Sequence, residues 1–119
     1  MIEGTCHCGA VSFKLANRPK HLTACNCTFC RRSGALWAHD AVDQITVIYA
    51  PDAVIRYSWG PKNLEVISCK TCGGTTHWES LDPEARPWMA VNCNMADPAS
   101  IAGIRVRNFD GADTWEYLD

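Results

Sequence analysis

The chain of 119 residues lacks an excess of positive charge and long hydrophobic runs, and each absence excludes a class of protein. Its formal net charge is −2 and its 11 Lys and Arg residues are scattered, so charge gives no reason to expect a nucleic-acid partner. No apolar stretch is long enough to span a bilayer, so we expect no membrane partner. Apolar residues make up 47% and charged residues 20%, an ordinary globular balance that argues against disorder.

The N-terminal segment also lacks the features of a secretion signal. Residues 1–6 contain neither a basic start nor an apolar run. We therefore expect one small domain over residues 1–119 in the cytoplasm, where thiols stay reduced. Eight cysteines in such a compartment indicate metal or redox chemistry rather than a disulfide framework.

Helical periodicity is also scarce, and short segments of alternating or β-branched residues predict a mainly β protein. The expected strands cover residues 11–15, 45–49, 64–68, 75–79, 88–92, 104–107 and 114–117. Two short helices are expected, one directly after Cys27 and one over residues 98–102. Such short strands anchor a sheet weakly, so metal cross-links would supply the missing stability.

Seven of the eight cysteines fall into three clusters. These are Cys6-His7-Cys8-Gly9, Cys25-Asn26-Cys27-Thr28-Phe29-Cys30 and Cys69-Lys70-Thr71-Cys72-Gly73. The first and third clusters end in Cys-Gly, and glycine tolerates the left-handed turn that points backbone N–H groups at thiolate sulfurs. Two such turns facing each other predict a closed, structural zinc site. Its ligands are Cys6, Cys8, Cys69 and Cys72.

The remaining cluster offers three thiolates, from Cys25, Cys27 and Cys30. A zinc ion with three protein ligands and one open position is typical of a catalytic site. A fourth protein ligand would close it instead, and the candidates are Cys93, His7, His39 and His77. All-sulfur sites favour zinc or iron–sulfur clusters. A division into four and three ligands fits two zinc ions better than two iron–sulfur clusters, because simple clusters usually need four cysteines each.

The three clusters and their flanking residues resemble a known family. Residues 4–13, Gly-Thr-Cys-His-Cys-Gly-Ala-Val-Ser-Phe, resemble the opening G-x-C-x-C-G-x-V-x-F of the glutathione-dependent formaldehyde-activating enzyme (GFA) family, which includes the centromere protein V domain. Residues 25–34 resemble its C-x-C-x-x-C segment with a following basic residue and glycine, and residues 69–73 resemble its last zinc knuckle. The three motifs occur in order, and the resemblance covers nearly the whole chain.

The resemblance implies a β-tent fold of twisted antiparallel sheets stitched by zinc. It implies a structural zinc on Cys6, Cys8, Cys69 and Cys72, and a catalytic zinc on Cys25, Cys27 and Cys30. It also implies a carbon–sulfur lyase activity on an adduct of glutathione and formaldehyde, S-(hydroxymethyl)glutathione. The expected partners are therefore a small thiol, such as glutathione, and an aldehyde.

Several side chains near the clusters have open roles. Arg31 and Arg32 either hold a carboxylate of the thiol through forked hydrogen bonds or form a solvated basic doublet. Cys93 is expected to be a small buried residue. The five tryptophans are expected mostly in the core, with Trp37 as a wall of the second zinc site.

Two other functions remain open from the sequence. The same clusters suit a non-catalytic zinc-binding scaffold or a protein-interaction module, in which a fourth ligand would close the second site. A redox role for Cys69 and Cys72 is the third reading, although the chain lacks the alternating helices and strands that usually frame such a motif.

Overall fold

A computed structural model describes residues 2–119 of the chain. Within these residues it contains ten strands, two short α-helices and three 3-10 turns. The strands are β1 Ile2–Thr5, β2 Ser12–Leu15, β3 His21–Cys25, β4 Trp37–Ala41, β5 Ile45–Ile48, β6 Val54–Tyr57, β7 Leu64–Cys69, β8 Thr75–Ser80, β9 Trp88–Asn92 and β10 Arg105–Phe109. The helices are α1 Thr28–Ser33 and α2 Pro98–Ile101.

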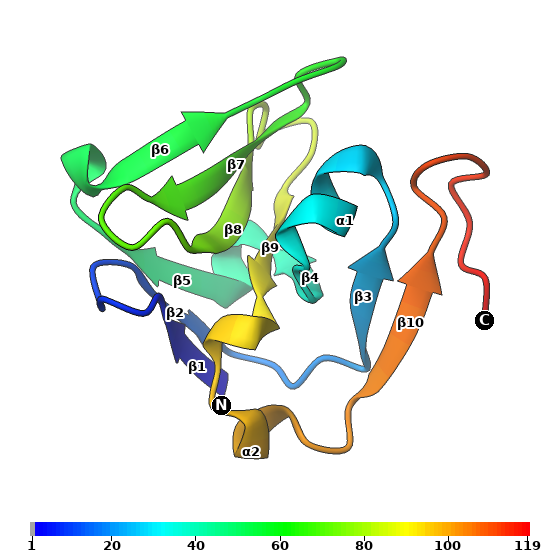
Figure 1. Ribbon diagram of the computed structural model, residues 1–119, viewed down its shortest axis with the longest axis horizontal. Coiled ribbons are helices and arrows are strands. Elements are labelled where there is room, and N and C mark those ends of the chain that lie inside the picture. Colours follow the sequence, from blue (N-terminus) through cyan, green and yellow to red (C-terminus); the bar gives the residue numbers. More distant parts are fainter. Residues whose placement is uncertain (1) are drawn as a thin grey trace.

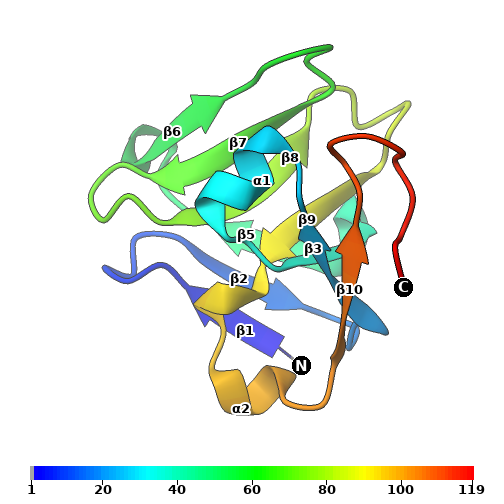
Figure 2. The ribbon, with the colours of Figure 1, turned by 45° about the vertical axis from the view of Figure 1, so that its right-hand side comes forward.

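The strands form a small sheet and a large sheet (Figure 1). The small sheet has the order β1-β2-β5, and the large sheet has the order β10-β3-β4-β9-β8-β7-β6. Among the described strands, every ladder is antiparallel except that of β10 with β3, which lie side by side in Figure 2. The prediction of a mainly β fold is confirmed, and the parallel pair is an addition that local sequence patterns did not indicate.

The core lies where the two sheets meet. Along β2, Phe13 and Leu15 are buried while Lys14 between them is exposed, as alternation predicts. These two side chains join one apolar cluster with Leu22 of β3 and Val91 of β9. The large sheet is therefore fixed against the small one by shared apolar burial, which is the main stabilising term of such a fold.

Six of the seven expected strands are present, and both expected helices form. Helix α1 begins after Cys27, which is its N-cap, and ends at Gly34 in the left-handed conformation with φ of 69°. The expected strand at residues 114–117 is wrong. The backbone N–H of Trp115 and the side chain of Thr114 instead bond to Asp110, which closes a turn and leaves only an isolated bridge at Tyr117.

Strands β1, β3, β4 and β6 were not expected from the sequence, because none of them shows the alternating or β-branched pattern clearly. Two of them, β3 and β4, lie between β10 and β9 in the large sheet and flank helix α1 along the chain. Neither helix within residues 2–119 has the length and apolar character needed to cross a membrane.

Candidate functional site

The first and third cysteine clusters meet although they lie some sixty residues apart in sequence. Cys6 and Cys8 follow β1, Cys69 ends β7, and the four sulfurs all lie within 4.8 Å of one another. The Cys8 and Cys69 sulfurs are 3.5 Å apart, and the Cys6 and Cys8 sulfurs are 3.7 Å apart. A zinc ion bonded to four sulfurs at ~2.3 Å requires sulfur–sulfur separations of about 3.8 Å, whereas a disulfide requires ~2.05 Å. The donor set therefore fits a tetrahedral zinc ion.

The glycines after these clusters make the turns that shape the site. Gly9 and Gly73 have φ of 85° and 78°, which confirms the predicted left-handed turns. Their N–H groups donate to the carbonyls of Cys6 and Cys69 at 3.0 and 2.8 Å. Backbone amides of Cys72 and Thr71 bond to the Cys69 sulfur and lower the pKa of its thiol. The turn at the third cluster thus favours the thiolate form of Cys69 that a metal ion requires.

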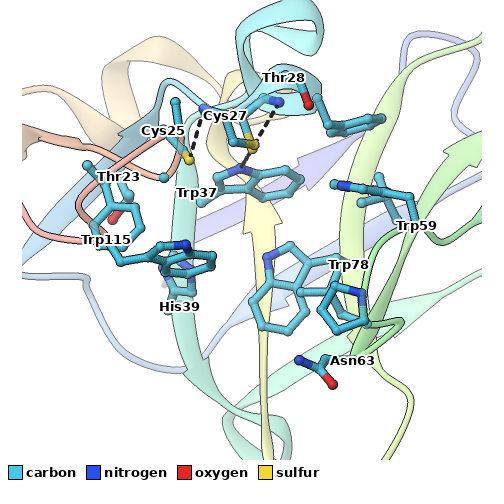
Figure 3. A pocket seen from close by; sticks show the side chains of 18 of the residues that line it. Thr23, Cys25, Cys27, Thr28, Trp37, His39, Trp59, Asn63, Trp78 and Trp115 are labelled. Carbon is cyan, nitrogen blue, oxygen red and sulfur yellow. Dashed lines mark hydrogen bonds between the residues drawn. The ribbon is translucent and has the colours of Figure 1, made fainter.

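The second cluster is held at the start of helix α1. Cys25 ends β3, Cys27 caps the helix, and Cys30 lies within it. The Cys27 N–H donates to the Cys25 sulfur at 3.5 Å, and the Cys30 N–H donates to the Cys27 sulfur at 3.3 Å (Figure 3). The Cys30 thiol and the Cys27 amide stabilise the Cys25 thiolate and lower its pKa to about 5. Trp37 supports the cluster from β4, since its indole N–H donates to the Cys30 sulfur at 3.3 Å.

The three sulfurs of the second cluster lie within 4.8 Å of one another, and no further His, Cys, Asp or Glu among residues 2–119 joins them. Cys93 is fully buried in the core, as expected, and burial raises the pKa of its thiol to about 11. The His77 ring is buried and bonds to Thr76 and Glu79. His7 is exposed beside the first cluster, and His39 is on β4. The donor set suits a zinc ion with three protein ligands.

A cavity of about 550 Å³ opens beside the second cluster. All three cysteines line it, together with aromatic side chains from β4, β8, helix α1, the loop after β6 and the C-terminal segment (Figure 3). The aromatic residues are Phe29, Trp37, Trp59, Trp78, Phe109, Trp115 and Tyr117. Of the described residues that line it, none is Asp, Glu, Lys or Arg. The cluster therefore faces a half-open, mostly apolar space.

The positions of the five tryptophans agree only in part with the expectation from sequence. Trp37 is 3% exposed and walls the second cluster, as expected. Trp59 and Trp78 are half-buried and line the cavity, and Trp78 also packs against the core, as expected. Trp88 and Trp115 are exposed by 53% and 73%, so their expected core position is wrong. Hydrophobicity indicates that a tryptophan needs apolar neighbours, but it does not indicate whether those neighbours form a core or a cavity.

Arg31 and Arg32 lie in the last turn of α1, close to the second cluster in sequence but outside the cavity. Both are exposed, and the Arg32 guanidinium donates to the Thr28 carbonyl at 2.7 Å. The structure does not bring them against the cysteines, and their contact with a carboxylate remains a prediction.

The C-terminal segment contributes residues to the site that were not expected from the sequence. The Asn26 amide donates to the Asp110 carboxylate at 3.0 Å and accepts from the Ala112 N–H at 3.0 Å. Gly111 packs so closely on the cluster that a Cβ atom there would lie 2.5 Å from the Cys25 sulfur. Local spacing in the sequence holds no sign that Gly111 contacts a cysteine so far upstream.

Comparisons with known proteins place this geometry in a family. Residues 1–108 match the model of the family described as glutathione-dependent formaldehyde-activating enzyme. The chain belongs to the GFA family. A crystal structure of a Rhodobacter sphaeroides protein is similar to it, with 28% identity and a TM-score of 0.70 over 87% of this chain and 98% of that one. The resemblance noted from the three motifs is thus confirmed.

Gly111→Ala tests how the C-terminal segment of this GFA chain supports the second cluster. We expect the added methyl group to displace Cys25 and to weaken metal binding there about tenfold or more. The first cluster is remote from Gly111 and should keep its metal, so it is an internal control. Metal content after competition with a graded chelator checks this, and two metals retained with unchanged affinity would contradict it.

His39 tests the polarity of the cavity. Its ring contacts Trp78 edge-on with centroids 5.7 Å apart. Although the side chain is exposed at the cavity, desolvation by the surrounding walls lowers its pKa to about 4, with a smaller effect of His21. The imidazole should stay neutral down to about pH 5 in an NMR titration. The unfolded chain takes up this proton below its ordinary pKa of 6.5, so His39 lowers the free energy of unfolding as pH falls from 6.5 toward 4. Titration of His39 near pH 6.5 in the folded protein would contradict this.

Proposed function

We propose that the chain is a zinc-dependent carbon–sulfur lyase or synthase acting on a thiol–aldehyde adduct such as S-(hydroxymethyl)glutathione. In this proposal Cys25, Cys27 and Cys30 hold the catalytic zinc, while Cys6, Cys8, Cys69 and Cys72 hold a structural zinc. The observation that carries it is a three-sulfur cluster, without a fourth protein ligand among residues 2–119, facing a cavity. A zinc ion held there supplies a Lewis-acidic position that favours the deprotonated form of a thiol at neutral pH.

The residues around the cluster hold this centre in place. Trp37 fixes the Cys30 sulfur through its indole N–H, and Asn26 ties the cysteine loop to Asp110. Aromatic side chains line the cavity, and a substrate that displaces water from it would strengthen electrostatic interactions inside it. The closed first cluster, in contrast, has no position to offer a substrate.

The proposed reaction forms or breaks one carbon–sulfur bond and transfers one proton. In the synthase direction the thiol sulfur bonds to the carbonyl carbon, the C=O pair moves to oxygen, and this oxygen takes up the proton that the thiol lost. The lyase direction reverses each step. His39 on the cavity wall is neutral, so a ring N–H can donate a hydrogen bond to the oxygen on which negative charge develops.

Arg31 and Arg32 complete the proposal from outside the cavity. Their exposed guanidinium groups lie on the same helix as Cys30, where they can bind carboxylates of a thiol such as glutathione. Arg31→Ala should then raise KM for glutathione and leave KM for cysteamine, which has no carboxylate, unchanged. Equal effects on both thiols would show a solvated doublet instead.

The test of the function is turnover by protein loaded with two zinc ions. Formation and breakdown of the glutathione–formaldehyde adduct are followed against the uncatalysed reaction, which is itself fast. We expect a zinc-dependent rate above that background. No such rate with both sites loaded would refute the enzyme and support the scaffold alternative.

A further inference from the structure

The cavity beside the second cluster is larger than a one-carbon aldehyde needs. Its volume is about 550 Å³, within the range of roughly 300–1,000 Å³ that is typical of pockets for drug-sized ligands. Formaldehyde is close in size to a water molecule, which occupies about 30 Å³ in the liquid. Formaldehyde alone would therefore leave most of the cavity unfilled.

The walls of the cavity favour a flat apolar group. Phe29 of α1 stacks on Trp59 with centroids 4.8 Å apart, and Trp59 stacks on Tyr57 at 5.4 Å. Trp78 of β8 and Trp37 of β4 also line the cavity (Figure 3). Aromatic rings bind best to other rings in offset-stacked or edge-on contacts, so these walls offer several surfaces for an aromatic ligand.

Apart from the three cysteines, the side chains that line the cavity are uncharged, whereas charged side chains lie outside it. Of the described lining residues none is acidic, lysine or arginine, and His39 is neutral. A buried charge without a partner is strongly unfavourable. Three thiolates with one divalent zinc ion also leave the centre with a net negative charge, which repels carboxylates. The charged parts of a thiol such as glutathione therefore belong outside, on the side of the exposed Arg31 and Arg32.

We propose that this cavity binds the uncharged aromatic group of an aldehyde much larger than formaldehyde, whose carbonyl carbon then lies beside the second cluster. This inference rests on the proposed function in one respect, namely that the occupant is the aldehyde part of a thiol adduct. The chemistry is unchanged: sulfur bonds to the carbonyl carbon and the thiol proton moves to the oxygen, with no oxidant or reductant.

Binding is tested first, without turnover. The probes are 2-naphthamide, which is neutral and unreactive, and 2-naphthalenesulfonate, which has the same rings and a negative charge. We expect tryptophan fluorescence of the zinc-loaded protein to report saturable binding of the amide and about tenfold weaker binding of the sulfonate. Equal binding of both probes, or no binding of the amide, would overturn the proposal.

Variants locate the binding site. Trp59→Ala should weaken binding of 2-naphthamide about tenfold, whereas Trp88→Ala, which removes an exposed tryptophan outside the cavity, should not. Asn63→Lys adds a cation at an exposed position that lines the cavity, and it should strengthen binding of the sulfonate. Insensitivity of the amide to Trp59→Ala in a folded variant, or of the sulfonate to Asn63→Lys, would contradict the proposal.

Turnover measurements distinguish a failure of the aromatic-aldehyde proposal from a failure of the proposed function. With glutathione fixed, kcat/KM should be at least tenfold higher for 2-naphthaldehyde than for formaldehyde, relative to each uncatalysed rate. Fast turnover of formaldehyde alone would overturn the aromatic substrate and support the enzyme. Amide binding that depends on Trp59, without turnover of any adduct, would refute the enzyme and support the aromatic site.

Discussion

A Cys69→Ser variant should lose the metal at the first cluster and most of its folded structure. Cys69 ends β7 with no exposed surface, and its sulfur lies 3.5 Å from that of Cys8, which follows β1 of the other sheet. Structural zinc contributes apparent binding free energies of about 10–16 kcal/mol, as much as the ~5–15 kcal/mol total stability of a typical domain. Metal analysis and far-UV circular dichroism of the purified variant check this expectation.

The matched control is Cys93→Ala. Cys93 is as fully buried as Cys69 but belongs to neither cluster, so its loss removes only packing. This variant should retain two metal ions and a cooperative unfolding transition. A Cys69→Ser protein that folds like the Cys93→Ala control would show that the four-sulfur cluster does not hold the sheets together.

A Cys30→Ser variant should lose the second metal and the activity while it keeps its fold. The second cluster is formed by β3 and the adjoining helix α1, so it joins no distant parts of the molecule by itself. Replacement of one of three thiolates by a hydroxyl removes a ligand that zinc strongly prefers. We expect metal content to fall from two ions to one and turnover to fall to the uncatalysed rate.

Ser33→Ala on the same helix is the control for this change. Its hydroxyl bonds only to the backbone, at Cys30 and Ala35, so metal content and activity should be unchanged. Circular dichroism should be the same for both variants. A Cys30→Ser protein with full activity would exclude the second cluster as the catalytic centre, and one that unfolds would assign it a structural role.

The parts of this molecule that local chemistry determines could be predicted from its sequence. Glycine directly after a cysteine indicated left-handed turns at Gly9 and Gly73, and both occur. Alternation along residues 11–15 indicated β2 and its buried face. Each signal depends on residues that lie next to one another in the chain, where conformational preference and side-chain direction are fixed by sequence spacing.

Apart from the meeting of the first and third cysteine clusters, the parts that depend on distant contacts could not be predicted in this way. The parallel pairing of β10 with β3 carries Gly111 against Cys25, and no local pattern indicates either contact. The hydrophobic side chain of Trp115 led us to expect it in the core. Its backbone instead has φ of 58°, and its side chain is 73% exposed and lines the cavity. The cavity is a product of tertiary arrangement, so its walls other than Trp37 became visible only in the structure.

The measurement that tests the account most directly is zinc X-ray absorption spectroscopy on freshly purified protein, combined with metal analysis. The account predicts two zinc ions per chain, one bound by four sulfurs and one by three sulfurs and a lighter atom that an added thiol replaces. Protein without metal, or with these cysteines in disulfides, would contradict it. So would four protein sulfurs on both ions, since the second centre would then be closed.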